Sequence, residues 1–391
     1  MPRLKIGGMT LAQSIKSGDS TMTPRQRLLA VYRGQTPDCV ASLADLSYWH
    51  SGNGGGKFIP GKTDGANQSK IDKLMELHHQ TGAAIHLNLG NYYNMSYSGD
   101  IQVDSGIRGD EYFHVFKTPL GNLSEIREWS DRSFSWPITH HMVQSIEDLK
   151  IIRYIFEHTH YRADWGPLHE ANAKVGELGL PLVQAPYTGM GFLMSRYAGI
   201  ESTVMFAADY PDEVMQTVQT INTAHRSVFE QLVAGPSEVL FVSDNLSSDV
   251  QYPAWFRKYS GEHYRWMAQV AHAADKPIAI HVDGRLRGIL AALNELGIDA
   301  ADAVTPAPWG DITGQQCRDE AGGKFVLSGG VPPNLFHHDI PLSMFDRGVE
   351  QWLALADRSP AIIIAPGDQL SPDGELDRVR RMVEMANARK F

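Results

Sequence analysis

The feature that most constrains the fold is a series of eight short apolar runs, most of them separated by segments long enough to form a helix. The runs are rich in Ile, Val, Leu and Ala, which is typical of strands that are buried on both faces. Eight such strands alternating with helices predict an α/β fold, a closed (β/α)8 TIM barrel. The runs lie at 39–45, 84–88, 181–185, 239–244, 278–283, 299–304, 325–329 and 361–365.

Helix signals lie between and around these runs. Thr23 and Pro24 before RQRLLAVYRG predict a helix that Thr23 caps, with Pro24 at its first position. The segments 208–234 and 371–389 predict crossover helices. The run at 299–304 also suits a helix, because it is rich in alanine.

One gap in the pattern, from 89 to 180, is longer than a single crossover helix needs. Within it, HVFKTPLGNLSEIREWS has the order strand, proline-containing turn, strand, which predicts an inserted hairpin near the barrel mouth. The glycine-rich segment 51–58 follows the first strand, where a barrel carries its catalytic-face loops. We expect one barrel domain over residues 22–391, preceded by an N-terminal extension, 1–21.

Composition narrows the class of protein. Hydrophobic residues make up 42% and charged residues 20% of the 391 residues, as in ordinary soluble globular proteins. A net charge of −10 without a dense Lys/Arg run argues against a nucleic-acid partner. No apolar stretch suits a signal peptide or a membrane span, so we expect a cytoplasmic protein. Cys39 and Cys317 are too far apart in sequence to indicate a disulfide framework or a thiolate zinc knuckle.

Polar residues that close the apolar runs predict the active site, because barrel chemistry takes place at the C-terminal ends of the strands. The Ile-His-Val-Asp-Gly segment at 280–284 places His281 and Asp283 two residues apart, on the same face of a strand. Asp368 follows the last run, with Gly367 before it. The last strand neighbours the first rather than the fifth, so Asp368 must approach His281 across the mouth.

An imidazole and two carboxylates with open positions form a reasonable site for zinc, manganese or iron. We therefore predict His281, Asp283 and Asp368 as catalytic residues and as metal ligands. By spacing alone, a His-x-Asp pair is more often a hydrogen-bonded structural pair, and this reading stays open. Asp244 has two equal readings, a catalytic carboxylate that transfers a proton or the cap of a turn.

Further side chains near the strand ends are candidates for binding a small-molecule substrate, although aromatic residues at such positions are as often simple packing. The substrate-binding candidates are Trp49, His50, Asn88, Tyr187 and Arg196.

The order of segments resembles the uroporphyrinogen decarboxylase superfamily over about residues 22–390. The resemblance is carried by TPRQRLLAVYRGQTPDCV, FKTPLGNLSE, APYTGMGFLMSRYAG, VSDNLSSDVQYPAWFRKYS, IAIHVDGRLRGILAALNELGIDA, VTPAPWGD, LSGGVPP and APGDQLSPDGELDRVRRMVEM. Its more specific parts are the TPLG segment, the H-x-D-G segment followed by TPAPWGD, and the closing G-D-x-x-x-P-D run.

The resemblance implies two chemistries, and the chain departs from both patterns. Uroporphyrinogen decarboxylases work without a cofactor and carry Arg-Gln-Ala-Gly-Arg after the first strand, where this chain reads SYWHSGNGGGKF. A catalytic-loop histidine near their C-terminus is replaced here by Asp368. Corrinoid- and coenzyme-M-linked methyltransferases bind zinc through His-x-Cys and a later Gly-Cys. Those positions read His281-Val282-Asp283 and Gly367-Asp368 here, so both thiolates are replaced by carboxylates.

From this comparison we predict a methyltransferase-like enzyme of one-carbon metabolism that demethylates a small O- or N-methyl compound toward a separate corrinoid protein. A metal at the three-residue site would polarise the leaving atom, or Asp283 and Asp368 would act as acid and base without one. The alternatives are a decarboxylase of uroporphyrinogen or a smaller acid, anchored by Arg196 or Arg285, and a catalytically silent ligand- or partner-binding barrel. The resemblance also suggests a homodimer.

Overall fold

The computed structural model describes residues 21–55, 57 and 65–391. The predicted N-terminal extension, 1–21, lies outside the described residues except for its last residue. Residues 56 and 58 of the glycine-rich segment also lie outside them.

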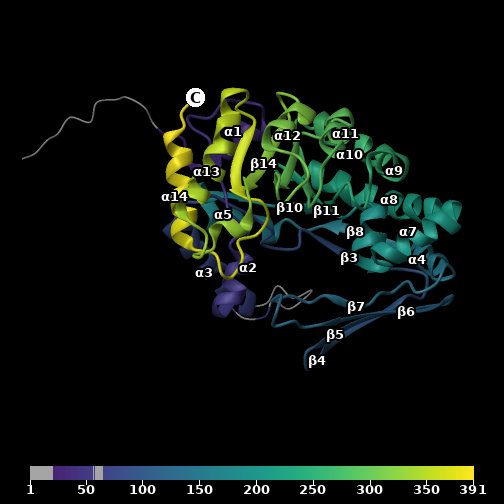
Figure 1. Ribbon diagram of the computed structural model, residues 1–391. Helices are drawn as coiled ribbons and strands as arrows, with labels where there is room; N and C mark the ends of the chain where they lie inside the picture. The colour runs from purple at the N-terminus through teal and green to yellow at the C-terminus, as the bar shows by residue number, and fades with distance from the viewer. Residues whose placement is uncertain (1–20, 56, 58–64) are drawn as a thin grey trace, which may run out of the picture.

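A parallel sheet of seven strands forms most of a barrel (Figure 1), and its strand order is β1-β15-β14-β13-β12-β11-β10. The eighth position is taken by β2 (Ile85–Leu87), which pairs in parallel with β9 (Gly179–Pro181). The chain continues from β9 into β10 after one residue, so β2 neighbours β10 in the barrel. The seven strands are β1 (Ala41–Ser42), β10 (Val183–Ala185), β11 (Leu240–Leu246), β12 (Ile278–Val282), β13 (Ala300–Val304), β14 (Val326–Val331) and β15 (Ile362–Pro366).

A bridge between Leu43 and Ala84 closes the ring between β1 and β2. The Ala84 amide donates to the Ser42 carbonyl at 3.1 Å, and the Ala44 amide donates to the Ala84 carbonyl at 3.2 Å. All eight predicted runs are therefore strands of a barrel, including the alanine-rich run that also suited a helix. This run becomes β13 because its residues pair with both neighbours, β12 and β14.

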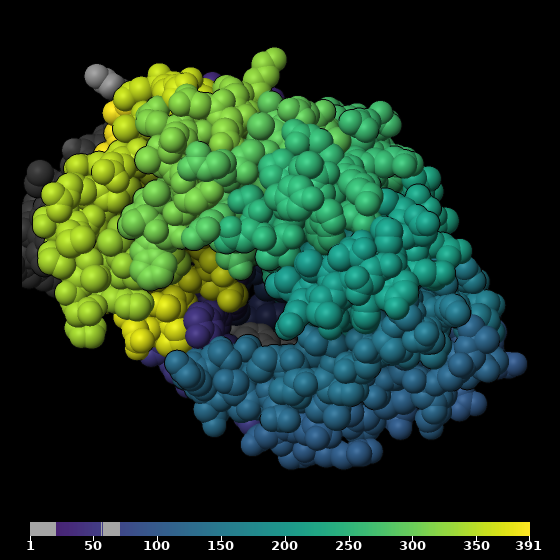
Figure 2. Space-filling model, turned by 45° about the vertical axis from the view of Figure 1, so that its right-hand side comes forward, coloured from purple at the N-terminus to yellow at the C-terminus, as the bar shows by residue number. Residues whose placement is uncertain are grey.

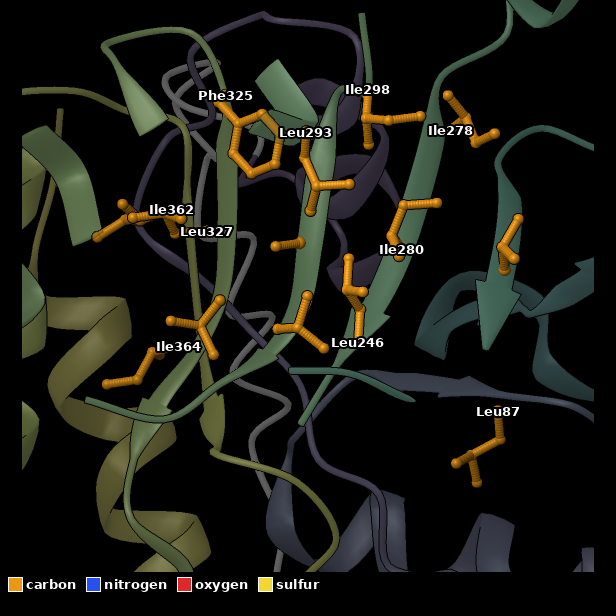
Figure 3. Close-up of a cluster of buried hydrophobic side chains, with 14 of the residues drawn as sticks. Leu87, Leu246, Ile278, Ile280, Leu293, Ile298, Phe325, Leu327, Ile362 and Ile364 are labelled. Atoms are coloured by element: carbon orange, nitrogen blue, oxygen red, sulfur yellow. The ribbon is translucent and has the colours of Figure 1, made fainter. Parts of the chain in front are cut away.

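Apolar side chains fill the layer between the barrel and its helices. Figure 3 shows Leu246, Ile280, Leu327 and Ile364 from four strands in one cluster, and each is 0% exposed. Helix α1 (Pro24–Tyr32) packs its buried side chains against residues at the N-terminal ends of the strands. Its predicted cap is confirmed, because the Thr23 hydroxyl accepts from the Gln26 amide in a capping box.

Helices cover the outside of the barrel (Figure 1), and two predicted ones differ in their limits. The predicted helix at 208–234 is divided at Tyr210, because Pro211 begins a new helix. The predicted helix at 371–389 begins only at Leu376. The α-helices are α2 (Ser47–His50), α3 (Gly65–Thr81), α5 (Gly166–Val175), α6 (Gly189–Phe192), α7 (Ile200–Asp209), α8 (Pro211–Ala234), α9 (Pro253–Tyr259), α10 (Gly261–Ala273), α11 (Ile289–Glu295), α12 (Gly314–Ala321), α13 (Leu342–Leu353) and α14 (Leu376–Ala388). Shorter helical turns are η1 (Ser51–Gly55), η2 (Gly176–Leu178), η3 (Leu193–Tyr197), η4 (Pro333–Phe336) and η5 (Ala354–Asp357).

The predicted inserted hairpin is confirmed as β5 (Glu111–Thr118) and β6 (Gly121–Glu128). It belongs to a larger four-stranded antiparallel sheet that extends to one side of the barrel (Figure 1). Its side chains share a second apolar core with α4, α6 and α8. The remaining elements of the insertion are β3 (Tyr93–Tyr97), β4 (Gln102–Arg108), β7 (Ile138–His140), α4 (Asp148–Glu157) and β8 (Thr159–Ala163).

Within the described part of the chain, no helix combines the length and the apolar character that a membrane crossing requires.

The close packing of the barrel predicts a large cost for a cavity in its outer layer. Leu327→Ala should lower the free energy of unfolding by about 2–5 kcal/mol, because Leu327 is 0% exposed. Leu120→Ala, in the turn between β5 and β6, should change it by less than about 0.5 kcal/mol, because Leu120 is 56% exposed. Urea unfolding of both variants measures the difference, and equal losses would contradict this account of the core.

Candidate functional site

A cavity of about 430 Å³ opens at the C-terminal ends of the barrel strands, and we call it the mouth cavity. Figure 2 shows a hollow bordered by yellow C-terminal, purple N-terminal, teal and blue segments. The same mixture of segments lines the mouth cavity, which is where a barrel of this kind carries its chemistry. Its polar lining residues are Asp45, His86, Asn88, Gln184, Tyr187, Arg196, Ser243, Asn245, His281, Asp283, Asp302, Asp368 and Gln369.

A larger surface groove, of about 610 Å³, is lined by residues of α4, β8 and α8. None of the strand-end residues lines this groove. Among its lining residues, the Asp, Glu and His side chains are limited to Glu157 and His160. The mouth cavity gathers four Asp and two His side chains. Chemistry therefore favours the smaller mouth cavity as the candidate site.

His281 lies between two carboxylates in the mouth cavity. Its Nδ1 is 3.5 Å from Asp302 Oδ2, and its Nε2 is 3.9 Å from Asp368 Oδ1. His281 and Asp302 are register partners on β12 and β13, so the sheet itself places them side by side. Because Nδ1 faces a carboxylate, it carries a proton, and Nε2 is the nitrogen directed toward Asp368.

Asp302 is held from the next strand as well. The hydroxyl of Ser328, a fully buried residue of β14, donates to Asp302 Oδ1 at 2.8 Å. The three residues come from three adjacent strands, and none of these contacts depends on a loop. The imidazole orientation is therefore set by the barrel scaffold.

The charges around His281 change its titration. Burial lowers the pKa of His281, but the hydrogen bond and charge of Asp302, together with the charges of Asp368 and Asp283, outweigh burial. The net effect raises this pKa above the ordinary 6.5. Burial raises the pKa of Asp302, yet the interaction with His281 leaves it below the ordinary 3.8. At pH 6.5 the pair is therefore chiefly an imidazolium facing a carboxylate.

Asp368 reaches the site from the loop after β15. Its side chain is half-exposed, and loss of contact with bulk water raises its pKa, with His281 opposing this effect. Gly367 permits this path, because a Cβ at that position would overlap the Thr305 hydroxyl. The next residue, Gln369, donates from Nε2 to Asp45 Oδ2 at 3.0 Å and ties the loop to the end of β1. Convergence across the mouth, as predicted from the sequence, is confirmed.

Two backbone irregularities adjoin the site. Asn245 in β11 and Ala303 in β13 have φ of 49° and 65°, and both strands shift register at these residues. Positive φ at a residue other than glycine costs about 1–3 kcal/mol and is concentrated at functional sites. Both residues line the mouth cavity, so the two bulges shape it.

The predicted substrate-binding residues divide into two groups. Asn88, Tyr187 and Arg196 line the mouth cavity. Trp49 and His50 are not among its lining residues, and Trp49 donates from Nε1 to the Gly374 carbonyl at 2.8 Å. Substrate binding by Trp49 and His50 stays a prediction.

Arg196 is the guanidinium of the mouth cavity. It lies 5.3 Å from the centre of the Tyr187 ring, a cation–π distance. Among the described residues, no carboxylate forms an ion pair with it. Arg285, the other predicted anchor, is paired with Asp249 at 3.4 Å and is not among the lining residues.

Asp244 is not among the residues that line the mouth cavity, so of its two equal readings the geometry favours the structural one. Its carboxylate accepts from the Thr188 amide at 2.9 Å, the Thr188 hydroxyl at 2.5 Å and the Tyr264 hydroxyl at 2.7 Å. These bonds tie β11 to the start of α6 and to α10. The reading as a structural capping residue therefore fits, because Asp244 is buried on the outer face of its strand.

Strand parity explains the position of Asp244, and strand register identifies a residue that sequence reasoning missed. Phe241, Ser243 and Asn245 line the cavity, so the intervening Asp244 must point to the other face. The register between β12 and β13 places Asp302 beside His281, because the two residues are partners in neighbouring strands. His86 was missed as well. Its buried imidazole lines the cavity with a pKa that burial lowers.

The predicted metal site requires three donors around one point. Across residues 21–55, 57 and 65–391, no group of three or more His, Cys, Asp or Glu side chains is placed to hold a metal ion. His281 and Asp368 face each other, while Asp283 lines the cavity without an ion pair to His281. The side chains as they lie do not fit the three-ligand site, and metal binding, zinc included, stays a prediction.

Comparisons with known proteins agree with the fold. A model of the uroporphyrinogen decarboxylase family (URO-D) matches residues 138–389, more than half of the chain. A solved structure of a methyltransferase from Methanosarcina mazei superposes with a TM-score of 0.59, covering 94% of this chain and 99% of the other. Sequence identity between the two is 15%, so this likeness shows the fold alone. No curated protein sequence matches the chain significantly.

The buried pair predicts a specific pH dependence of stability. The raised pKa of His281 stabilises the fold below pH 6.5, and this contribution is lost as the pH rises through the raised pKa. The lowered pKa of Asp302 stabilises it above pH 3.8, and this contribution is lost as the pH falls through the lowered pKa. A double-mutant cycle of His281→Asn and Asp302→Asn, measured by urea unfolding, should give a coupling of about 1–3 kcal/mol between these limits.

The same cycle measured at increasing pH is the control, and the coupling should shrink as the pH rises through the raised pKa of His281, because the imidazole then loses its charge. A coupling that stays constant after NMR shows that His281 has lost its proton would contradict the ion pair.

Proposed function

The chain belongs to the uroporphyrinogen decarboxylase family, and we propose that it demethylates a small O-methyl or N-methyl compound with His281 as general acid. The observation that carries this proposal is the position of His281, which lines the mouth cavity with Nδ1 facing Asp302 and Nε2 directed toward Asp368. A proton held at this position suits a reaction that leaves negative charge on a heteroatom.

The proposed step breaks the bond between the methyl carbon and its oxygen or nitrogen. The bonding electron pair stays on the heteroatom, and the proton on His281 Nε2 passes to it. An alkoxide or a deprotonated amine is a poor leaving group, so proton transfer of this kind contributes about 10²–10⁴-fold to the rate. The methyl acceptor in this proposal is a corrinoid on a separate protein, which would supply the nucleophile when bound.

The carboxylates around His281 have distinct parts in this step. Asp302 holds the imidazole in one tautomer and stabilises its charge before the proton leaves. Asp368, at 3.9 Å from Nε2, lies on the side from which His281 is reprotonated. Its half-exposed carboxylate can pass a proton from solvent to the neutral imidazole.

Decarboxylation of a small acid is the second candidate, and Arg196 favours it. This guanidinium lines the mouth cavity without an ion pair to a carboxylate in the described chain, so a substrate carboxylate has a partner there. His281 would then protonate the carbanion that remains after loss of CO₂. Uroporphyrinogen fits less well, because its eight carboxylates would lie among four Asp side chains in this cavity. Of the described residues that line it, Arg196 is the Lys or Arg that could pair with them, so most of these carboxylates would stay unpaired.

Replacement of His281 tests the proposed chemistry. His281→Asn should lower kcat by about 10²–10⁴-fold, and the wild-type rate should fall as the pH rises through the raised pKa of His281. The matched control is His272→Asn, because His272 also pairs with an aspartate, Asp299, at 2.9 Å but lies outside the mouth. Demethylation of methoxy and methylamino compounds, with a reduced corrinoid as acceptor, provides the assay.

Two further measurements separate the alternatives. Release of CO₂ from small carboxylic acids, or coproporphyrinogen formed from uroporphyrinogen, would favour decarboxylation over demethylation. Metal analysis of protein purified without chelators tests the metal site. Stoichiometric metal that is lost in both Asp283→Ala and Asp368→Ala would contradict a reaction driven by His281 alone. A chain that binds ligands but is inactive in every assay would be the silent barrel.

A further inference from the structure

We infer that a second cavity, between the barrel and the inserted sheet, binds the ring of a small aromatic carboxylic acid. This cavity has a volume of about 230 Å³, below the roughly 300–1,000 Å³ of sites for drug-sized ligands, so it suits a single ring. We call it the aromatic cavity, because its walls include Tyr93, Tyr97, Phe156, Tyr161, Phe192 and Tyr197.

The rings in these walls contact one another mainly edge to face. Tyr93 and Tyr161 lie 5.9 Å apart at 67°, and Phe156 and Tyr197 lie 5.9 Å apart at 69°. Rings fixed in this way offer both faces and edges to a flat guest. An aromatic guest gains ring–ring contacts here in addition to simple burial, and a saturated ring does not.

Four tyrosine hydroxyls around this cavity are without a partner. In the described chain, Tyr93, Tyr97, Tyr161 and Tyr197 make no hydrogen bond through their hydroxyls. Burial raises the pKa of each, that of Tyr93 to about 12, so all four stay protonated donors. All four side chains are partly exposed and line the cavity, so their hydroxyls can donate to a ligand that carries oxygen acceptors.

The charged side chains at the cavity favour one sign of charge on that ligand. Arg127 and Arg196 line it, and Glu125, with a 4% exposed side chain, is already paired with Arg127 at 2.5 Å. The positive charge of Arg196 is therefore not balanced by a carboxylate among the lining residues, and this favours an anionic ligand. Aromatic cavities also suit methylated ammonium groups, but the excess guanidinium would repel such a cation.

His225 adds an acceptor to the same wall. Its Nδ1 lies 2.9 Å from the Tyr187 carbonyl and must carry the proton, so Nε2 is an acceptor. Burial lowers the pKa of His225 to about 3, so the imidazole stays neutral at physiological pH. A ring that carries a hydroxyl as well as a carboxylate would therefore be bound more tightly than benzoate.

The aromatic cavity adjoins the mouth cavity. Arg196 lines both, and the consecutive residues Pro186 and Tyr187 line one each. A carboxylate on Arg196 with its ring among the tyrosines would therefore lie at the border of the cavity that His281 lines. Ligand binding here is independent of the reaction, whereas the identification of this ligand as the substrate rests on the proposed function.

Calorimetric titration with benzoate tests the site. Wild-type protein should bind benzoate more tightly than cyclohexanecarboxylate and should not bind tetramethylammonium. Tyr161→Phe with Tyr197→Phe should weaken benzoate binding by about fivefold to tenfold, because the rings remain and two donors are lost. Arg196→Gln should weaken it by at least tenfold. The matched control, Tyr210→Phe, should have no effect, because Tyr210 lies 48% exposed outside the cavity.

Three results would overturn the inference. They are no binding of benzoate to the wild-type protein, binding that the tyrosine and Arg196→Gln variants leave unchanged, and tighter binding of tetramethylammonium. His281→Asn separates this inference from the proposed function, because it should lower kcat by about 10²–10⁴-fold and change benzoate affinity far less than Arg196→Gln does. If benzoate binds in the expected pattern but demethylation is absent, only the proposed function fails.

Discussion

The contact between His281 and Asp302 is the interaction on which the rest of the site depends. Adjacent strands in register place the two side chains together, and Ser328 on the third strand completes the support. Partial removal from water makes the pair strongly coupled, so the carboxylate fixes both the charge and the tautomer of the imidazole. Asp368 lies 3.9 Å from the other ring nitrogen, Nε2, on a loop that Gln369 ties to Asp45.

The two cavities differ in charge, and Arg196 lies between them. The mouth cavity is acidic, with Asp45, Asp283 and Asp368 around His281. The aromatic cavity has one guanidinium in excess and a set of free tyrosine donors. A substrate with an anionic aromatic part and an uncharged reacting group would match this polarity. A substrate with charge on every side, such as uroporphyrinogen, would not.

The fold was predictable to a far greater extent than the site. Strands buried on both faces leave a local apolar signature, so all eight runs could be located. His281 and Asp368 could be found because they close such runs. Asp302 lies inside an alanine-rich run and Asp244 has the wrong parity, and only the register of neighbouring strands reveals either fact. The tyrosine cavity depends on packing between distant segments and leaves no pattern in the sequence.

The central claim is that His281 is an imidazolium oriented by Asp302 in the mouth of the barrel. Titration of His281 by ¹⁵N NMR tests it most directly, because ring-nitrogen shifts report both the pKa and the tautomer. The account predicts a pKa above 6.5, a proton on Nδ1 in the neutral form, and a lower pKa in both Asp302→Asn and Asp368→Asn. A pKa below 6.5, or one that neither substitution changes, would contradict it.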